Sequence, residues 1–311
     1  MLTVRPAGPG DARDICALLN AVDTIEIGRP ETDLHEVEAD LNHPDVDLAT
    51  DSWLAVEGGR PVAYGLVWDA GEPGRVDCDH YVLPGHQAAG AHLLDLMETR
   101  ARAMAGAAPG SLRLQLNVRP TLDTALLDDR GWRTVRRYHA MVRDLDPAAD
   151  LPPSPPPGAP GLTLRHCGTD EADRRRAHAL VERTFAEHFG HVEREFDAWL
   201  DHYGARDLDW SLVWIATVPG HGDAAVLVSR DDRTAMGWIS HIGVAKELRG
   251  LGIGGHLLRH GFAAYAARGR DTLGLGVDTR NASGALALYE AHGMRMHFAV
   301  NTWELPLHPQ E

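Results

Sequence analysis

Arg249-Gly-Leu-Gly-Ile-Gly254 follows a short β-type run, Trp238 to Val244, and opens a segment with helical hydrophobic spacing. A strand, a glycine turn and a helix start in this order predict a pyrophosphate site. Backbone N–H groups at a helix N-terminus have no partner within the helix, and the helix dipole favours an anion there. Gly250 lets the turn adopt unusual φ and ψ, while Gly252 and Gly254 leave room for close approach of a phosphate. The leading arginine adds a fixed positive charge suited to phosphate oxygens.

The same stretch also fits G-x-G-x-x-G through Gly250, Gly252 and Gly255, so a dinucleotide fingerprint is an alternative. That fingerprint requires its glycines directly at a strand end, within the first βαβ unit of a larger parallel sheet. Here Ala245 to Leu248 intervene, and too little chain follows Gly255 to build that fold. A tight glycine turn without any ligand is the second alternative.

The R-x-x-G-x-G pattern after Ile242-Gly-Val244 resembles the acetyl-CoA signature of the GNAT superfamily of N-acetyltransferases. The resemblance continues downstream with a strand-like run, Leu273 to Val277, and then Asn281. A helical segment with Tyr289 follows, for which Ser283 is the expected N-cap and Gly293 the expected terminating glycine. The resemblance implies that acetyl-CoA is the acyl donor and that its binding residues are Ile242, Gly243, Val244, Arg249, Gly250, Leu251, Gly252, Ile253, Gly254 and Asn281.

Acyl transfer from a thioester to an amine also needs a proton for the departing thiolate. The resemblance implies Tyr289 as this general acid; the alternative is an ordinary tyrosine of an amphipathic helix. A thiol near pKa 8.5 and a phenol near pKa 10 differ by roughly 1.5 units, which is small enough for proton transfer.

A neutral amine is the further requirement, and here the chain departs from the family. Family members often carry a glutamate at the position held here by Trp238 or Met236. By strand alternation Trp238, Ser240 and Ile242 share one face, so Ser240 is expected to hold a water that removes the proton. His241, on the opposite face, titrates in a suitable range. It is equally well explained as a packed histidine.

A proline-rich stretch, residues 147–160, splits the chain almost in half. The halves resemble each other at a nearly constant offset of 160 to 162 residues, from Leu162 against Leu2 to Val244 against Val82. We therefore expect a degenerate N-terminal domain (1–146), a semi-rigid linker (147–160) and a catalytic C-terminal domain (161–311). Each domain is expected to be an α/β fold of the α+β type, with a mixed, mainly antiparallel sheet flanked by helices.

The N-terminal counterpart of the signature reads Gln87-Ala-Ala-Gly90-Ala-His92. His92 replaces the second glycine, and Leu127, which has no proton to donate, stands at the position of Tyr289. The first copy is therefore expected to be catalytically silent, and the sequence leaves open whether it still binds coenzyme A.

The acceptor site is expected in the variable segment of the second half, Phe185 to His191 and Phe196 to Trp199. Its aromatic rings and polar groups (Glu187, His188, His191 and Asp197) suit a polar, cationic molecule, although an amphipathic helix explains the apolar members. The H-x-x-H spacing lacks an evident third ligand, so no metal is expected.

Composition limits the partners. The formal net charge of −15 argues against nucleic acid and suits a cationic acceptor. Three scattered cysteines indicate a reducing cytoplasm, and no apolar run approaches the roughly 18 residues of a membrane span. We expect an acetyl-CoA-dependent N-acetyltransferase that acts by direct attack of a small-molecule amine. The duplicated arrangement also resembles mycothiol synthases, so acetylation of a cysteinyl amino sugar is an alternative, as is a non-catalytic acetyl-CoA-binding module.

Overall fold

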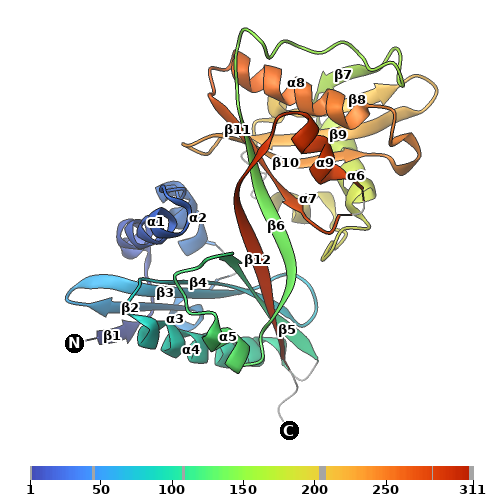
Figure 1. The fold of residues 1–311 in the computed structure, drawn as a ribbon. Coiled ribbons are helices and arrows are strands. Elements are labelled where there is room, and N and C mark those ends of the chain that lie inside the picture. Colours follow the sequence, from blue (N-terminus) through green and yellow to red (C-terminus); the bar gives the residue numbers. More distant parts are fainter. Residues whose placement is uncertain (1, 44–45, 107–108, 203–207, 282, 308–311) are drawn as a thin grey trace. The chain divides into compact units, whose positions relative to one another are not determined.

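The computed structural model describes residues 2–43, 46–106, 109–202, 208–281 and 283–307. The chain forms two compact units. The first comprises Met1–Tyr138 and Phe298–Glu311, and the second comprises His139–His297. Each unit contains a mixed, mainly antiparallel sheet with helices on its faces, which confirms the expected fold class (Figure 1).

Six strands follow one another across the sheet of the first unit in the order β1-β2-β3-β4-β5-β12. Their bounds are β1 Leu2–Arg5, β2 Ser52–Glu57, β3 Arg60–Asp69, β4 Arg75–Val82, β5 Gly110–Asn117 and β12 Arg295–Leu307. The helices are α1 Ala12–Ile27, α2 Leu34–Leu41, α3 Leu48–Asp51, α4 Gln87–Ala105 and α5 Ala125–Asp129. β4 and β5 run parallel, whereas the other recorded pairs in this unit are antiparallel.

Local sequence explains the main features of this unit. Gly58 and Gly59, both with positive φ, form the tight turn between β2 and β3, as the glycine pair predicts. The apolar stripe of α4 is buried through Leu93, Met97 and Ala101. Figure 1 shows α1 and α2 on one face of this sheet and α4 on the other. The two faces thus have separate hydrophobic cores.

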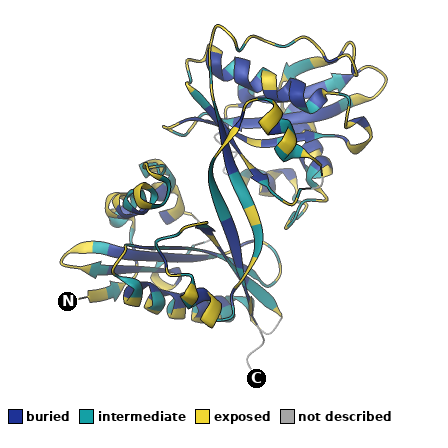
Figure 2. Cartoon of the chain, viewed as in Figure 1, coloured by how far each residue is buried: buried dark blue, intermediate teal, exposed yellow. Residues whose placement is uncertain are grey.

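In the second unit the strand order is β6-β11-β10-β9-β8-β7. The strands are β6 Arg133–Asp144, β7 Thr163–His166, β8 Val213–Val218, β9 Gly222–Arg230, β10 Gly237–Val244 and β11 Thr272–Asp278. The helices are α6 Glu171–Phe185, α7 Phe196–His202, α8 Ile253–Ala267 and α9 Ala285–Ala291. Alternate residues of β8 and β9 belong to two different cores, one with α8 and one with α6 and α7. Figure 2 shows buried residues running along the central strands and the helix faces turned toward them.

Each half of the sequence contributes its last strand to the unit formed mainly by the other half. Residues 300–307 of β12 pair with β5 of the first unit, although they end the C-terminal half of the sequence. In the second unit the strand next to β11 is β6, whose residues 139–144 precede the proline-rich stretch. The unit boundaries therefore differ from the predicted 147–160 linker, because each copy completes its sheet with a strand from the other half of the sequence.

The second half of the proline-rich stretch packs against the second unit. A Cβ at Gly158 would lie 2.6 Å from the Leu251 carbonyl oxygen, and Ala159 is 2% exposed within the core that contains α8. This part of the predicted spacer therefore belongs to a folded unit.

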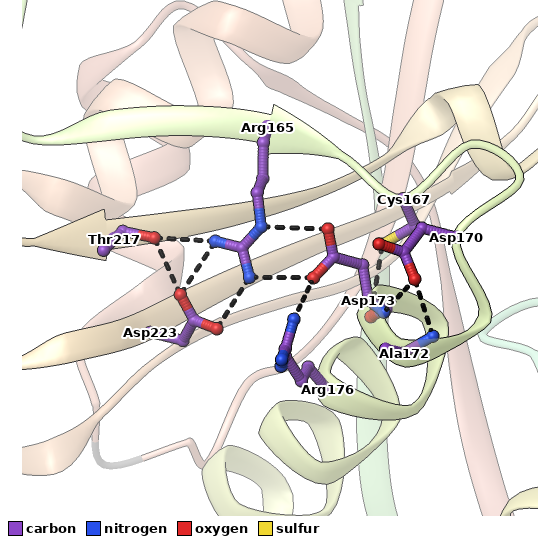
Figure 3. Close-up of polar contacts among 8 residues, drawn as sticks. All are labelled: Arg165, Cys167, Asp170, Ala172, Asp173, Arg176, Thr217 and Asp223. Carbon is purple, nitrogen blue, oxygen red and sulfur yellow. Dashed lines mark hydrogen bonds and ion pairs between the residues drawn. The ribbon is translucent and has the colours of Figure 1, made fainter.

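An ion-pair network anchors the edge strand β7 (Figure 3). The Arg165 guanidinium forms bidentate contacts of 2.7–3.0 Å with Asp173 at the start of α6 and with Asp223 of β9. Thr217 of β8 also accepts a hydrogen bond from Arg165. The Arg165 side chain thereby joins β7 to α6, β8 and β9.

Across the part of the chain that the structure describes, we find no helix whose length and apolar character would allow it to span a bilayer.

Candidate functional site

The glycine-rich loop lies between β10 and α8, as predicted. A short 3-10 helix, η4 (Lys246–Leu248), separates β10 from the loop, and Gly252 is the N-cap of α8. Gly250 and Gly252 have φ of +82° and +83°, a region that glycine enters without strain. The His256 N–H donates to the Gly252 carbonyl at 3.0 Å as the first bond of the helix. The N–H groups of residues 253–255 precede that bond at the start of a 15-residue helix, and such a helix N-terminus favours an anion.

The sequence predicts that Gly252 and Gly254 leave room for a phosphate, but the space beside both is taken by other residues of the protein. A Cβ at Gly250 would meet nothing within 4 Å, so the loop is open there. A Cβ at Gly252 would lie 3.0 Å from Pro156, and one at Gly254 would lie 3.2 Å from Leu288 of α9. Gly252 and Gly254 therefore leave space for neighbouring protein atoms. Of these three glycines, only Gly250 borders open space.

Three other predicted residues hold the loop in place. Ile253 is 1% exposed, and Leu251 packs against the same core. Arg249 is exposed, and its Nε donates to the Val244 carbonyl at 3.2 Å, which keeps the guanidinium beside the loop. A diphosphate would thus meet both the helix N-terminus and a fixed cation.

The strands β10 and β11 diverge before the loop. Their recorded parallel pairing runs from Gly237↔Leu273 to Ile239↔Leu275. β10 continues to Val244 paired with β9 on its other side. The backbone groups of Ile242, Gly243 and Val244 on the β11 side therefore lie beyond the ladder. They can bind an extended arm and a carbonyl inserted between the strands.

A β-bulge at Ser240 changes which residues of β10 lie on each face of the sheet. In the pairing with β9, Ile239 faces Ser229 and His241 faces Val228, so Ser240 is the extra residue. Before the bulge, Gly237 lies against Tyr265 of α8. After it, Gly243 lies against Thr184 of α6, and Ile242 packs into the α8 core.

The prediction that Trp238, Ser240 and Ile242 share one face is therefore wrong. Trp238 packs over Gly274 on the face opposite α8, whereas Ile242 turns toward α8. The bulge reverses the alternation on which that prediction depended. Ser240 itself is exposed.

Tyr289 lies on α9 and is 5% exposed. Its hydroxyl makes no hydrogen bond with another residue that the structure describes, and burial raises its pKa above the usual value. The phenol is thus protonated at neutral pH. The N-cap of α9 is Gly284, with φ +74°, instead of the expected Ser283, because the chain enters this short helix through a left-handed turn. Gly293, with φ +80°, follows the helix as predicted.

Asn281 follows β11 and shapes the turn before α9. Its Oδ1 accepts the Ser283 N–H at 2.8 Å, and its own N–H donates to the Asp278 carbonyl at 3.1 Å. The side-chain oxygen of Asn281 therefore helps to fix this turn.

His241 lies on the face of β10 that turns to α6 and α7, and the other histidines and the carboxylate of this region belong to α6 and to the loop after it. The His241 ring lies 5.1 Å from Phe185 and 6.4 Å from Trp199, between ring centroids. Burial, with the nearby charges of His188 and His191, lowers the pKa of His241 to about 4. His241 is therefore neutral at physiological pH and too weakly basic for the proton-accepting role considered from the sequence.

Sequence reasoning missed Glu182. Its carboxylate, on a side chain 10% exposed, lies 3.1 Å from His191 Nε2 and 3.6 Å from His178 Nε2. His178 and Glu182 are four residues apart on α6, and this spacing places two side chains on the same face of a helix. It is the sequence pattern from which their contact could have been predicted. The position of His191, in the loop after the helix, had no such signal.

His188 connects this cluster to the donor loop. Its ring lies 4.2 Å from Phe185, and burial lowers its pKa. The charges of Asp278 at the end of β11 and of Arg249 in the loop also act on its pKa. Of the other expected acceptor residues, Glu187 is exposed and pairs with Lys246 at 2.6 Å, and Asp197 is exposed on α7. Neither lies within the buried cluster.

Within the described ranges, no three His, Cys, Asp or Glu side chains come together as a metal ion would require.

The first unit lacks the corresponding loop. α4 begins at Gln87, so the residues equivalent to Arg249–Gly252 already lie in its first turn. Both ends of the Gln87 amide are used, with Nε2 donating to the Thr121 carbonyl and Oε1 accepting from the Asp123 N–H. His92 is exposed on α4, so helix extension, and not the bulk of His92, removes the loop.

Comparison with known proteins agrees with this geometry. Residues 209–294 match the family described as Acetyltransferase (GNAT) domain. A mycothiol acetyltransferase of Beutenbergia cavernae is 35% identical over 172 residues, which are 52% of this chain and 56% of that protein. The aligned region thus spans little more than half the length of this relative.

Two solved structures resemble the whole chain. A GCN5-related N-acetyltransferase from Sphaerobacter thermophilus has a TM-score of 0.82 at 25% identity, covering 100% of this chain and 97% of that one. A tandem GNAT protein from the clavulanic acid biosynthesis pathway has a TM-score of 0.72 at 17% identity and covers 100% of both chains. Residues 209–294 thus match a GNAT acetyltransferase domain, and the chain as a whole shares its fold with a tandem GNAT protein.

Proposed function

We propose that the second unit transfers an acetyl group from acetyl-CoA to the amine of a small molecule by direct attack. The observation that supports this most is the combination of diverging strands with an open glycine loop at the start of α8. The loop N–H groups and Arg249 would hold the diphosphate. The unpaired backbone edge of Ile242 to Val244 would hold the pantetheine arm and polarise the acetyl carbonyl, as backbone donors do in an oxyanion hole.

Tyr289 is the general acid of this proposal. The amine nitrogen attacks the acetyl carbon, the carbon–sulfur bond breaks, and the Tyr289 hydroxyl protonates the departing sulfur. Burial raises the pKa of Tyr289, and it would act in the same direction on a thiolate beside it. The difference in acidity between the two groups is therefore largely preserved.

The Glu182–His191 pair is the base that we propose for the acceptor amine. A carboxylate 3.1 Å from His191 stabilises the imidazolium that forms when the ring accepts a proton. Both side chains are mostly buried, which strengthens this effect. Ser240, exposed at the bulge, stays a candidate for holding a water on the path of the proton.

The acceptor is expected to be a small cationic amine, consistent with the acidic chain. The sequence identity with a mycothiol acetyltransferase favours a second candidate, a cysteinyl amino sugar. A neutral amine is needed in both cases. An α-amine near pKa 8 costs about 1–1.5 kcal/mol to neutralise at pH 7, against about 4–5 kcal/mol for a lysine-like amine.

Thiol release from acetyl-CoA, measured with a panel of amines, tests the proposal. An N-acetyltransferase releases thiol in proportion to acetylated amine, which mass spectrometry identifies. A non-catalytic acetyl-CoA-binding module would bind acetyl-CoA in calorimetry without turnover for any amine. Absence of acetyl-CoA binding, with tight binding of a nicotinamide nucleotide, would refute the donor site.

A further inference from the structure

Gly255 lies in the first turn of α8, immediately after the donor loop. Its φ is not positive, unlike that of Gly250 and Gly252, so its backbone conformation is open to any residue. Glycine within a helix is destabilising relative to alanine, because it loses more conformational freedom on folding. The space around Gly255, and not its backbone, is therefore what favours a glycine at this position.

The His292 ring fills that space. A Cβ at Gly255 would lie 2.7 Å from His292 Nε2 and 2.8 Å from its Cε1, closer than real Cβ atoms approach other heavy atoms. The ring is held by its own helix, α9, because Nδ1 lies 2.8 Å from the Leu288 carbonyl, which can only accept the hydrogen. A larger residue at position 255 would therefore have to break that hydrogen bond or displace α9.

A second glycine of α8 lies against α9 beside this contact. A Cβ at Gly254 would lie 3.2 Å from Leu288 Cδ2, which is tighter than most Cβ contacts. Leu288 also packs against the core that contains α8. Two consecutive glycines thus let α9 approach the first turn of α8 at Leu288 and at His292.

Tyr289 lies between these two contact residues and is joined to His292 through the backbone. The Tyr289 carbonyl accepts the N–H groups of His292 and Met294, each at 3.1 Å. Residues three apart also lie on the same side of a helix. The Tyr289 side chain is 5% exposed within the core shared with α8. The seat of α9 on α8 therefore sets where the phenol hydroxyl lies.

We propose that Gly255 and His292 are positioning residues for Tyr289. The absence of a side chain at position 255 admits the imidazole, and the seated ring fixes α9 and the phenol that α9 carries. This inference rests on the proposed function, in which Tyr289 protonates the departing sulfur. The same turn of α8 carries the N–H groups assigned to the diphosphate, so the contact also fixes the acid relative to the donor. A misplacement of about 1 Å can lower a rate by about 10²-fold.

Gly255→Ala tests the proposal through a split between turnover and binding. We expect kcat to fall about tenfold or more, because α9 moves the acid away from the sulfur. The Kd of acetyl-CoA in calorimetry should stay at the wild-type value, because alanine retains the N–H group of residue 255. Adding His292→Ala to this variant removes the clashing ring and should restore part of the lost kcat.

Gly261→Ala is the matched control, since it makes the same change in the same helix. Its Cβ would meet Leu227 Cδ2 at an ordinary 3.4 Å, on β9 and away from α9. This variant should retain the wild-type kcat and the wild-type Kd of acetyl-CoA.

Fluorine NMR on the full chain labelled with 3-fluorotyrosine tests the contact without any need for turnover. The chain has 6 tyrosines, and the Tyr289 signal is the one that disappears in Tyr289→Phe. We expect this signal to shift in Gly255→Ala and to return toward its wild-type position when His292→Ala is added. It should not shift in Gly261→Ala.

An unchanged Tyr289 signal in Gly255→Ala, or an equal shift in Gly261→Ala, would overturn the proposal. So would an equal fall in kcat when Gly255→Ala is introduced into Tyr289→Phe, because an effect that acts through the phenol is lost with it. Absence of turnover by the wild-type chain with every amine would instead refute the proposed function. The fluorine shift in Gly255→Ala would then still support the seating of Tyr289 by this contact.

Discussion

Gly243 of β10 lies directly against Thr184 of α6: a Cβ at position 243 would fall 2.1 Å from Thr184 Oγ1 and 2.7 Å from its Cβ. The threonine cannot turn aside freely, because its hydroxyl donates to the Leu180 carbonyl at 2.7 Å and the residue is 5% exposed. The close approach of α6 sets the position of the backbone edge that we assign to the pantetheine arm.

Gly243→Ala should therefore displace β10 from α6. We expect a destabilisation of about 1–3 kcal/mol, the usual range for overpacking, and weaker acetyl-CoA binding in calorimetry. Thr184→Gly in the same chain should restore part of both losses. Gly276→Ala on β11 is the matched control, because its Cβ would meet Trp238 at an ordinary 3.9 Å. Equal effects in the two alanine variants would contradict the importance of the α6 contact.

Tyr289→Phe should lower turnover about 10²-fold or more while the Kd of acetyl-CoA stays constant, since the hydroxyl acts on the leaving sulfur and not on binding. Thiol release and calorimetry measure the two quantities. Tyr265→Phe controls for loss of a buried hydroxyl, because that group donates to the Arg230 carbonyl at 2.8 Å within the core. The control should lower Tm without lowering the rate of the folded enzyme. Wild-type turnover in Tyr289→Phe would exclude the general acid.

Glu182→Gln should lower turnover at pH 7 by at least tenfold, because His191 loses the carboxylate that stabilises its protonated ring. The loss should be greater for amines near pKa 10 than for α-amines near pKa 8, which are more often neutral. Glu187→Gln is the matched control, since Glu187 is exposed and contacts Lys246. A uniform loss for all amines, or an equal loss in Glu187→Gln, would point to a structural role for Glu182.

The sequence predicted features that depend on local chemistry. The turn at position 250 has positive φ, which glycine adopts without strain, so the loop could be predicted from its glycines. Leu93 and Met97 recur at helical spacing and are buried, so the core helix could be predicted as well. The bulge at Ser240 did not follow, because it arises from the pairing of β10 with β9 and leaves no pattern in β10 itself. The Glu182–His191 contact joins a helix to a loop, and such tertiary contacts have no fixed spacing.

Acid should weaken the Arg165 network of Figure 3. Hydrogen bonds from Arg165 lower the pKa of Asp173 and of Asp223 below the usual value. A depressed pKa in the folded state contributes stability that is complete above the unfolded value near 3.9 and is lost as pH falls through the folded value. Since Arg165 is partly exposed, we expect on the order of 1 kcal/mol. Arg165→Met should flatten the fall in unfolding free energy below about pH 4, and an unchanged acid slope would contradict this account.

Strand exchange predicts which fragment of the chain folds as the donor unit. A fragment of residues 161–311 follows the proline-rich boundary but omits 139–144, the part of β6 that lies next to β11. It also retains the strand residues 300–307, whose partner β5 it lacks. An unpaired sheet edge and an unpartnered strand both favour aggregation. We therefore expect the fragment 139–297 to be monomeric, to unfold cooperatively and to bind acetyl-CoA, whereas 161–311 should have a lower Tm or aggregate. Circular dichroism, size-exclusion chromatography and calorimetry on both fragments compare them directly. A stable, acetyl-CoA-binding 161–311 alongside an unfolded 139–297 would instead support the boundary at the proline-rich stretch.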